Sequence, residues 1–187
     1  MIRAFIAITP PATLHQTMAE VRQVFQHLSP AWRWVTPNHM HLTLKFLGNV
    51  PDESVTALLQ AIAHAAQGQT VFPLRARALG CFPQPARPRV LWVGLDDPRQ
   101  ALGRLNERLM AALTPLGFPP EERPFHPHLT LARAQNGARS SQLLPMLQKY
   151  HNRDFGEFLV TQLHLVQSAL QRGGAQHTLL RSVPLQS

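Results

Sequence analysis

The tetrapeptide His-Leu-Thr-Leu occurs twice in this chain, at residues 41–44 in MHLTLKFLG and at residues 128–131 in PHLTLAR. The two copies lie nearly half the chain apart, and both segments read as strands. A third His-x-Thr triplet, at residues 15–17, lies in a segment with helical periodicity, so the triplet alone is a weak signal. With leucine required at both other positions, random placement predicts only about 0.01 copies. We therefore interpret the pair as a duplicated functional motif.

The spacing within the motif has a structural meaning when each copy lies in a strand. Residues i and i+2 of a strand point to the same side, so His41 and Thr43 share one face while the leucines face the core. His128 and Thr130 repeat this arrangement. If a pseudo-twofold axis relates the two copies, two His-Thr pairs face each other across a cleft.

Two imidazoles on opposite sides of one substrate suit acid–base catalysis, because the ordinary histidine pKa lies near neutrality. Threonine hydroxyls donate hydrogen bonds to phosphate oxygens, and an arginine adds a charge-assisted bond. The arrangement suits cleavage of a phosphodiester without a metal ion. The alternative is that each histidine caps a strand end or satisfies a buried backbone group, which explains a lone histidine better than a matched pair.

The remaining sequence alternates between strand-like and helix-like segments, and its second half repeats the order of the first. The sequence predicts an α+β fold of two similar lobes, in a single domain spanning residues 1–187. Strands are expected at residues 2–8, 32–35, 40–47, 70–79, 89–95, 128–134, 158–166 and 177–183, with the strand at 40–47 ending at Gly48. Helices are expected after residue 9, over 51–67, over 97–116 and over 140–150.

The charge balance favours an anionic partner. The 187 residues include 18 Lys+Arg and 10 Asp+Glu, which leaves a net charge of +8. Such a surplus is typical of proteins that bind nucleic acid or phosphorylated small molecules, and a proteome-wide arginine bias would also produce it. Asp97 precedes Pro98 and a predicted helix, so we interpret it as a helix cap and not as a metal ligand.

Cysteine content and hydropathy exclude several other classes. The single Cys81 rules out an intramolecular disulfide and a multi-cysteine metal site, and it is better explained as a packed thiol than as a nucleophile. The first apolar run is stopped by two prolines and is too short for a secretion signal. No run of about 18 apolar residues occurs. We therefore expect a cytoplasmic protein that does not contact a membrane.

These motifs together resemble the two-histidine phosphoesterase superfamily. Within it they are similar to the bacterial and archaeal RNA 2′,3′-cyclic phosphodiesterases, also called 2′-5′ RNA ligases. The resemblance covers nearly the whole chain, through RAFIAITPP, WRWVTPNHMHLTLKFLGNV, GCFPQPARPRVLWVGL, RPFHPHLTLARA and LHLVQSAL. It implies a bilobal α+β fold with an antiparallel sheet flanked by helices in each lobe, and an active-site groove between the lobes.

The resemblance also implies an activity. It implies metal-independent opening of RNA 2′,3′-cyclic phosphate ends to 2′-phosphate ends, without a nucleotide cofactor, and in some members the joining or cleavage of 2′-5′ linkages. The expected substrate is RNA with a cyclic phosphate end, such as a tRNA half, acted on by a monomer. A relative that acts on small cyclic nucleotides or 2′-5′ oligonucleotides, or a non-catalytic RNA-binding protein, would share the motifs.

Carried onto this chain, the resemblance implies that His41 and His128 are the catalytic pair and that Thr43, Thr130 and Arg133 bind the phosphate. It assigns His41 as the acid that protonates the leaving 3′ oxygen and His128 as the base that activates water. The pseudo-symmetry leaves the reverse assignment open.

The strand alternation raises one difficulty for this site. Simple alternation puts Arg133 on the face opposite His128, so Arg133 reaches the groove only if the strand bends, ends or bulges after Leu131. His126 either supports the site or is simply exposed, and Pro127 breaks the strand pattern between it and the motif.

Other residues carry two interpretations. Trp34 and Phe82 are able to stack on a nucleobase, whereas Trp34 is also a candidate core residue. Arg87 and Arg89 either track RNA phosphates or belong to a solvated face. His177 stands where many relatives carry a tyrosine, so any substrate contact of that tyrosine is altered or lost here.

Overall fold

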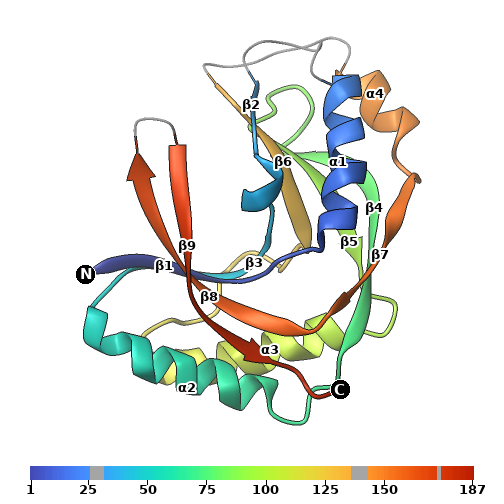
Figure 1. Cartoon of the computed structure of the whole chain (residues 1–187). Coiled ribbons are helices and arrows are strands. Elements are labelled where there is room, and N and C mark those ends of the chain that lie inside the picture. The colour runs from blue at the N-terminus through green and yellow to red at the C-terminus, as the bar shows by residue number, and fades with distance from the viewer. Residues whose placement is uncertain (26–31, 136–142, 172–173) are drawn as a thin grey trace.

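The strands form two antiparallel sheets (Figure 1), in a computed structural model that describes residues 1–25, 32–135, 143–171 and 174–187. The four-stranded sheet has the order β3 (Leu42–Val50), β1 (Ile2–Ile8), β8 (Gln162–Gln171), β9 (Gly174–Pro184). The five-stranded sheet has the order β2 (Trp32–Trp34), β6 (His128–Ala134), β5 (Val90–Asp96), β4 (Phe72–Phe82), β7 (Asp154–Val160). The predicted α+β class is confirmed.

Helices cover the sheets on their outer sides. Helices α1 (Ala12–Phe25) and α4 (Leu143–Lys149) contact strands of the five-stranded sheet, whereas α2 (Val55–Ala66) contacts β8 and β9 and packs along α3 (Ala101–Leu113). Three short 3₁₀ turns, η1 (Pro37–His39), η2 (Asp52–Ser54) and η3 (Thr114–Leu116), join these elements. No helix among the described residues is long and apolar enough to cross a membrane.

The apolar stripe of α1 shows why this segment is a helix. Leu14, Met18, Val21 and Phe25 recur at intervals of three and four residues, and all four side chains are buried. The same spacing predicts that Leu28 continues this stripe, and Leu28 lies outside the described residues.

The apolar interior is one continuous cluster that takes residues from both sheets. Ile6 and Leu42 reach it from the four-stranded sheet and Leu129 from the five-stranded sheet, and each is at most 1% exposed. Burial of each such side chain contributes about 1.5–3 kcal/mol. Leu44 and Leu131 are buried as well, so the leucines of both motifs face the core, as the alternation predicts.

Neither sheet is built from one half of the chain. The four-stranded sheet takes β1 and β3 from the N-terminal part of the chain, up to Val50, and β8 and β9 from its C-terminal part. The five-stranded sheet takes its strands from the intervening segments and from β2. The two motif strands therefore belong to different sheets, β3 at the edge of one and β6 inside the other, and they contact each other.

Several strand bounds predicted from sequence are wrong. The strand expected over 70–79 continues to Phe82, and the strand expected over 177–183 begins at Gly174. The single strand expected over 158–166 is two strands, because the chain leaves the five-stranded sheet at Val160 and enters the four-stranded sheet at Gln162. Both flanks are apolar, which made the run look continuous. The strand at 40–47 does not end at Gly48, because β3 continues to Val50 with Gly48 at φ +71° beside a register shift.

The capping role expected for Asp97 is confirmed. Its carboxylate accepts hydrogen bonds from the backbone N–H groups of Ala101, Leu102 and Gly103, at 3.1, 2.8 and 3.2 Å. The first N–H groups of a helix have no partner within the helix, so a carboxylate there satisfies them and complements the helix dipole.

Replacing Asp97 by alanine is expected to lower the free energy of unfolding by about 0.5–2 kcal/mol, because three N–H groups lose their acceptor. Urea denaturation followed by circular dichroism measures the change. Asp96→Ala is the matched control, since the Asp96 carboxylate is half exposed and only pairs with Arg77 at 3.7 Å. A loss of stability in Asp97→Ala no larger than in the control would show that Asp97 does not support α3.

Candidate active site

Each motif histidine is held by a hydrogen bond to the backbone two residues before it. The Nδ1 atom of His41 lies 2.7 Å from the carbonyl oxygen of His39, and that of His128 lies 2.7 Å from the carbonyl oxygen of His126. A carbonyl oxygen only accepts, so Nδ1 donates and carries the proton. In both neutral rings Nε2 is then left with a free lone pair, which is the state needed to exchange a proton with a substrate.

One groove brings together most of the residues that the sequence singles out as site candidates. His41 and Thr43 reach it from the four-stranded sheet, and His128 and Thr130 from the five-stranded sheet. The predicted site residues that line the groove are Trp34, His41, Thr43, Phe82, Arg89, His126, His128, Thr130, Arg133 and His177. The two His-Thr pairs therefore face the same groove, as expected if the repeated tetrapeptide is a functional motif.

A β-bulge in β6 turns Arg133 toward the groove. Thr130 pairs with Trp92 and Ala132 pairs with Leu91, so Leu131 is an extra residue in the β5–β6 register. Leu131 and Ala132 are both buried in consequence, and Arg133 lies on the side of His128 and Thr130. The sequence pattern allows Arg133 to reach the groove only if the strand bends, ends or bulges, and this bulge meets that condition.

The first motif carries the same bulge, and this reveals a site residue that the sequence analysis missed. Thr43 pairs with Ala7 and Lys45 pairs with Ile6, so Leu44 is the extra residue in β3. The residue five places after His41 is therefore turned to the groove, as Arg133 is. That residue is Phe46, which lines the groove and is 57% exposed. Its equal spacing from the motif histidine was the available signal.

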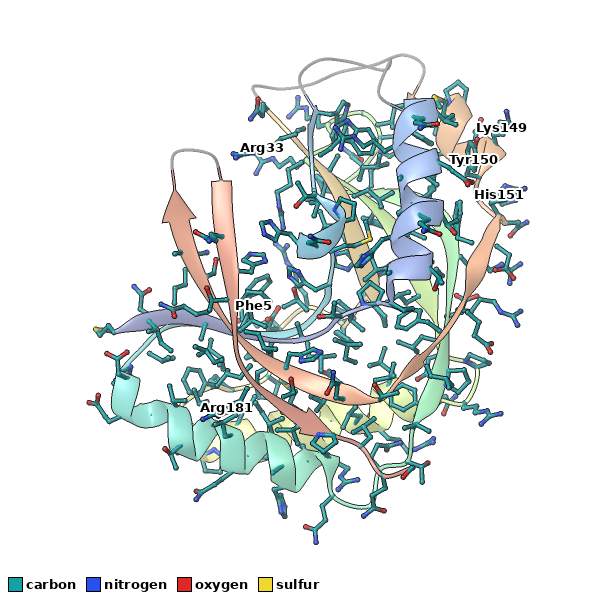
Figure 2. All side chains as sticks on the ribbon, viewed as in Figure 1. Phe5, Arg33, Lys149, Tyr150, His151 and Arg181 are labelled. Atoms are coloured by element: carbon teal, nitrogen blue, oxygen red, sulfur yellow. The ribbon has the colours of Figure 1, made fainter. Side chains whose placement is uncertain are left out.

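Aromatic rings pack around His41. Phe5 on β1, labelled in Figure 2, is buried and stacks on the imidazole with ring centroids 4.7 Å apart. His177 on β9 meets the rings of His41 and Phe5 edge-on, at 5.1 and 5.0 Å. The ring of His39 lies 5.1 Å from that of His177. His177 is thus a neighbour of the first motif histidine and not of the second.

The second histidine has its own aromatic surroundings. The rings of Phe82 and Trp92 lie 5.1 and 6.3 Å from that of His128. An added Cβ at Gly80 would meet the Trp92 ring at 2.2 Å, so only glycine admits the indole there. The side chain of His126 is exposed, and its ring lies 4.8 Å from that of Trp92. Both interpretations of His126 therefore hold: its side chain is exposed, and the residue supports the site because its backbone carbonyl oxygen holds the His128 ring.

The other aromatic and basic candidates are placed as follows. Trp34 is half buried, and it both lines the groove and packs against the core, so its two interpretations coexist. Arg89 lines the groove, whereas Arg87 is exposed and is not among the lining residues. Arg75 and Arg77 also lie away from the groove and pair with Asp154, Glu157 and Asp96.

Lys45 ties the first motif to the segment that leads into the second. Its side chain is buried, and Nζ donates a hydrogen bond of 2.6 Å to the carbonyl oxygen of Pro119 and lies 3.9 Å from the Glu121 carboxylate. Residues 119–127 follow this anchor directly into β6. The position of His128 thus depends partly on a residue that follows the first motif.

The groove lowers the pKa of both motif histidines. Burial is the main cause for His41, and the nearby His177, Arg133 and His39 add to it, so its pKa falls to about 4 despite the bond to the His39 carbonyl. Burial, His126 and Arg133 lower the pKa of His128. At neutral pH both rings are therefore neutral in the empty groove. A bound phosphate would oppose Arg133 and favour protonation of a nearby ring.

Among the described residues, no group of three or more His, Cys, Asp and Glu side chains is arranged to hold a metal ion. The groups that converge on the groove are imidazoles, hydroxyls and a guanidinium. Such a set binds an anion and exchanges protons with it.

A groove between two antiparallel sheets, with two His-x-Thr pairs facing it, is the arrangement expected of a two-histidine phosphoesterase. The model of the 2'-5' RNA ligase superfamily matches residues 10–172, and this chain belongs to that superfamily. An Aeropyrum pernix protein named RNA 2',3'-cyclic phosphodiesterase is 32% identical over 166 residues, which cover 89% of this chain and 93% of that protein.

Solved structures agree with the fold. TT0787 of Thermus thermophilus superposes with a TM-score of 0.84 at 29% identity, over 98% of this chain and 97% of that chain. E. coli LigT complexed with 3'-AMP superposes with a TM-score of 0.81 at 30% identity, over 100% of this chain and 99% of that chain. The resemblance recognised from the motifs is confirmed.

The lowered pKa of His41 is directly testable by NMR titration of its Cε1 proton, with a midpoint expected near 4. Arg133→Gln removes a cation, so the protonated ring costs less and the midpoint is expected to rise. Arg181→Gln is the control, because Arg181 lies on β9 outside the groove (Figure 2) and should leave the midpoint unchanged. A wild-type midpoint near 6.5, or equal midpoints in all three proteins, would contradict this electrostatic account.

Proposed function

We propose that this protein hydrolyses RNA 2′,3′-cyclic phosphate ends to 2′-phosphate ends, without a metal ion. The observation that carries the proposal is the matched pair of histidines, each held through Nδ1 with Nε2 free, beside Thr43, Thr130 and Arg133 in one groove. Relatives named RNA 2',3'-cyclic phosphodiesterase support it, as do the similar LigT structures complexed with 3'-AMP and with phosphate.

The chemistry needs one histidine of each protonation state. Nε2 of neutral His128 takes a proton from water as the water oxygen bonds to phosphorus. The bond from phosphorus to the 3′ oxygen breaks, and that oxygen takes a proton from Nε2–H of protonated His41. The 2′ oxygen keeps the phosphate. Joining a 2′-5′ linkage follows the same course, with a 5′ ribose hydroxyl in the place of water. In the reverse reaction, which cleaves a 2′-5′ linkage, the 3′ oxygen attacks phosphorus, the 5′ oxygen leaves, and the two histidines exchange roles.

The remaining groups act on charge and position. The hydroxyls of Thr43 and Thr130 donate to the non-bridging phosphate oxygens, and the Arg133 guanidinium balances the negative charge that develops as water adds. Phe46 offers an exposed ring on the same groove, beside Phe5 at a centroid distance of 6.1 Å. An exposed aromatic ring in a groove is a stacking surface for a base.

The proposal extends to the biological setting. Ends of this kind on RNA fragments, tRNA halves among them, are the natural substrates, and the groove lies within one chain, so a monomer acting in the cytoplasm is sufficient. Identification of the product as a 2′- or a 3′-phosphate names the oxygen that leaves. Size-exclusion chromatography with light scattering tests the monomer.

His41→Ala and His128→Ala are each expected to lower the rate of ring opening about 10²–10⁴-fold, because each removes a proton-transfer group. The assay uses an oligonucleotide ending in a 2′,3′-cyclic phosphate, in EDTA. His151→Ala is the matched control, since Nδ1 of His151 makes the same kind of bond, 2.6 Å to the Gln148 carbonyl, outside the groove (Figure 2). Full activity in both motif variants, or loss of wild-type ring opening in EDTA, would contradict the proposal.

The dependence of kcat/KM on pH follows from the lowered pKa values. The singly protonated pair dominates between the two pKa values, that is, between about 4 for His41 and a value below 6.5 for His128, and its proton lies mainly on His128. The assigned roles use the form with the proton on His41, which is a constant fraction of the singly protonated pair at every pH and therefore follows the same pH dependence. The rate is therefore expected to peak on the acid side of pH 6.5 and to fall as pH rises further, because the acid loses its proton. A profile that climbs steadily through pH 8 would contradict the assignment of two histidines.

A further inference from the structure

Three arginines line one end of the groove, two on the neighbouring strands β2 and β6 and one just before β5. Arg33 on β2 stands directly opposite Arg133 on β6, and Arg133 stands opposite Val90, the residue after Arg89. All three side chains are exposed and line the groove. Figure 2 shows Arg33 on the side of β2 that faces the β8–β9 hairpin, at the far end of the groove from the helices α2 and α3.

The backbone holds Arg89 in this row even though it lies outside a strand. Its N–H donates to the Phe82 carbonyl at 2.7 Å, and its carbonyl accepts from the Ala134 N–H at 2.8 Å. The three guanidinium groups therefore extend from adjacent, fixed backbone positions. Strands lie about 4.8 Å apart, so the row spans roughly 10 Å across β2, β6 and the start of β5.

The row is unfavourable without an anion. Like charges directly opposite each other on two strands destabilise a sheet. Among the described residues, none of the three arginines forms an ion pair with a carboxylate. Residues 26–31, 136–142 and 172–173, which the structure does not describe, include no Asp or Glu. Elsewhere on the same sheet the chain does pair its arginines, because Arg75 and Arg77 have carboxylate partners.

We infer that Arg33 and Arg89, together with Arg133, form a subsite for the phosphodiester that precedes the terminal nucleotide, so that an oligonucleotide is preferred to a mononucleotide. The inference rests on the proposed function. With the cyclic phosphate at Thr43 and Thr130, Arg133 stands between that phosphate and Arg33. An RNA strand carries one negative charge per nucleotide, so the next phosphate along the strand meets the outer arginines.

A solvated face explains exposed arginines in general. It does not explain why two of them stand directly opposite each other beside His128 and Thr130, where a phosphate is proposed to bind. Guanidinium groups are suited to this role, because their planar forks bind phosphate with two parallel hydrogen bonds.

The test compares kcat/KM for three substrates: adenosine 2′,3′-cyclic phosphate, the same nucleotide with a 5′-phosphate, and the dinucleotide ApA ending in a 2′,3′-cyclic phosphate. The readout is the ratio of kcat/KM for the dinucleotide to that for the unphosphorylated mononucleotide. In Arg33→Gln/Arg89→Gln this ratio is expected to fall about 10-fold, as loss of a charge-assisted phosphate contact implies. Arg33→Lys keeps part of the preference, and Arg181→Gln keeps the wild-type ratio.

A second measurement separates a phosphate contact from a general loss of structure. The slope of log kcat/KM against log salt concentration for the dinucleotide should become less negative by about 0.7 for each lost phosphate contact. An unchanged ratio and slope in the double variant would overturn the inference. An equal gain from a 5′-phosphate on the mononucleotide would also overturn it, because the subsite would then read a terminal phosphate. If no substrate is opened, the proposed function fails instead.

Discussion

Two hydrogen bonds of the same kind determine the state of this site, from Nδ1 of His41 and of His128 to the carbonyl oxygen two residues earlier. They fix the tautomer and the orientation of each ring at once. The aromatic neighbours Phe5 and Trp92, the bulges of both motif strands and the anchoring of the segment before His128 serve these two rings. Because the acceptor is a backbone carbonyl oxygen, each hydrogen bond can form whatever side chain residues 39 and 126 carry.

Much of the site was predictable because its signal is local. Strand periodicity places His128 with Thr130 on one face, and the same rule holds for His41 with Thr43. The strand at residues 128–134 has the predicted bounds, and the buried stripe of α1 follows from its spacing. The capping role of Asp97 is predictable because its carboxylate and the N–H groups that donate to it lie within a few residues of each other.

The parts that escaped prediction depend on pairing between distant strands. A bulge is a property of register, so nothing near Leu44 or Leu131 states that the alternation shifts there. For this reason Phe46 was missed, and Arg133 was placed only conditionally. Likewise, the opposition of Arg33 to Arg133 exists only once β2 and β6 pair. The division of the 158–166 run into two strands reflects a change of sheet, which hydropathy does not register.

The interleaved course of the chain has a consequence for how the protein is made. Ala4 on β1 pairs with Gln167 on β8, and His177 on β9 packs against His41, so the earliest strand of the chain finds one of its two neighbours among the latest strands. Contacts so distant in sequence close large loops and slow folding. During translation, β1 and β3 therefore stay without the rest of their sheet until β8 and β9 have left the ribosome. The enzyme acquires its groove late and all at once, and a nascent chain exposes the apolar edge of β1 until then.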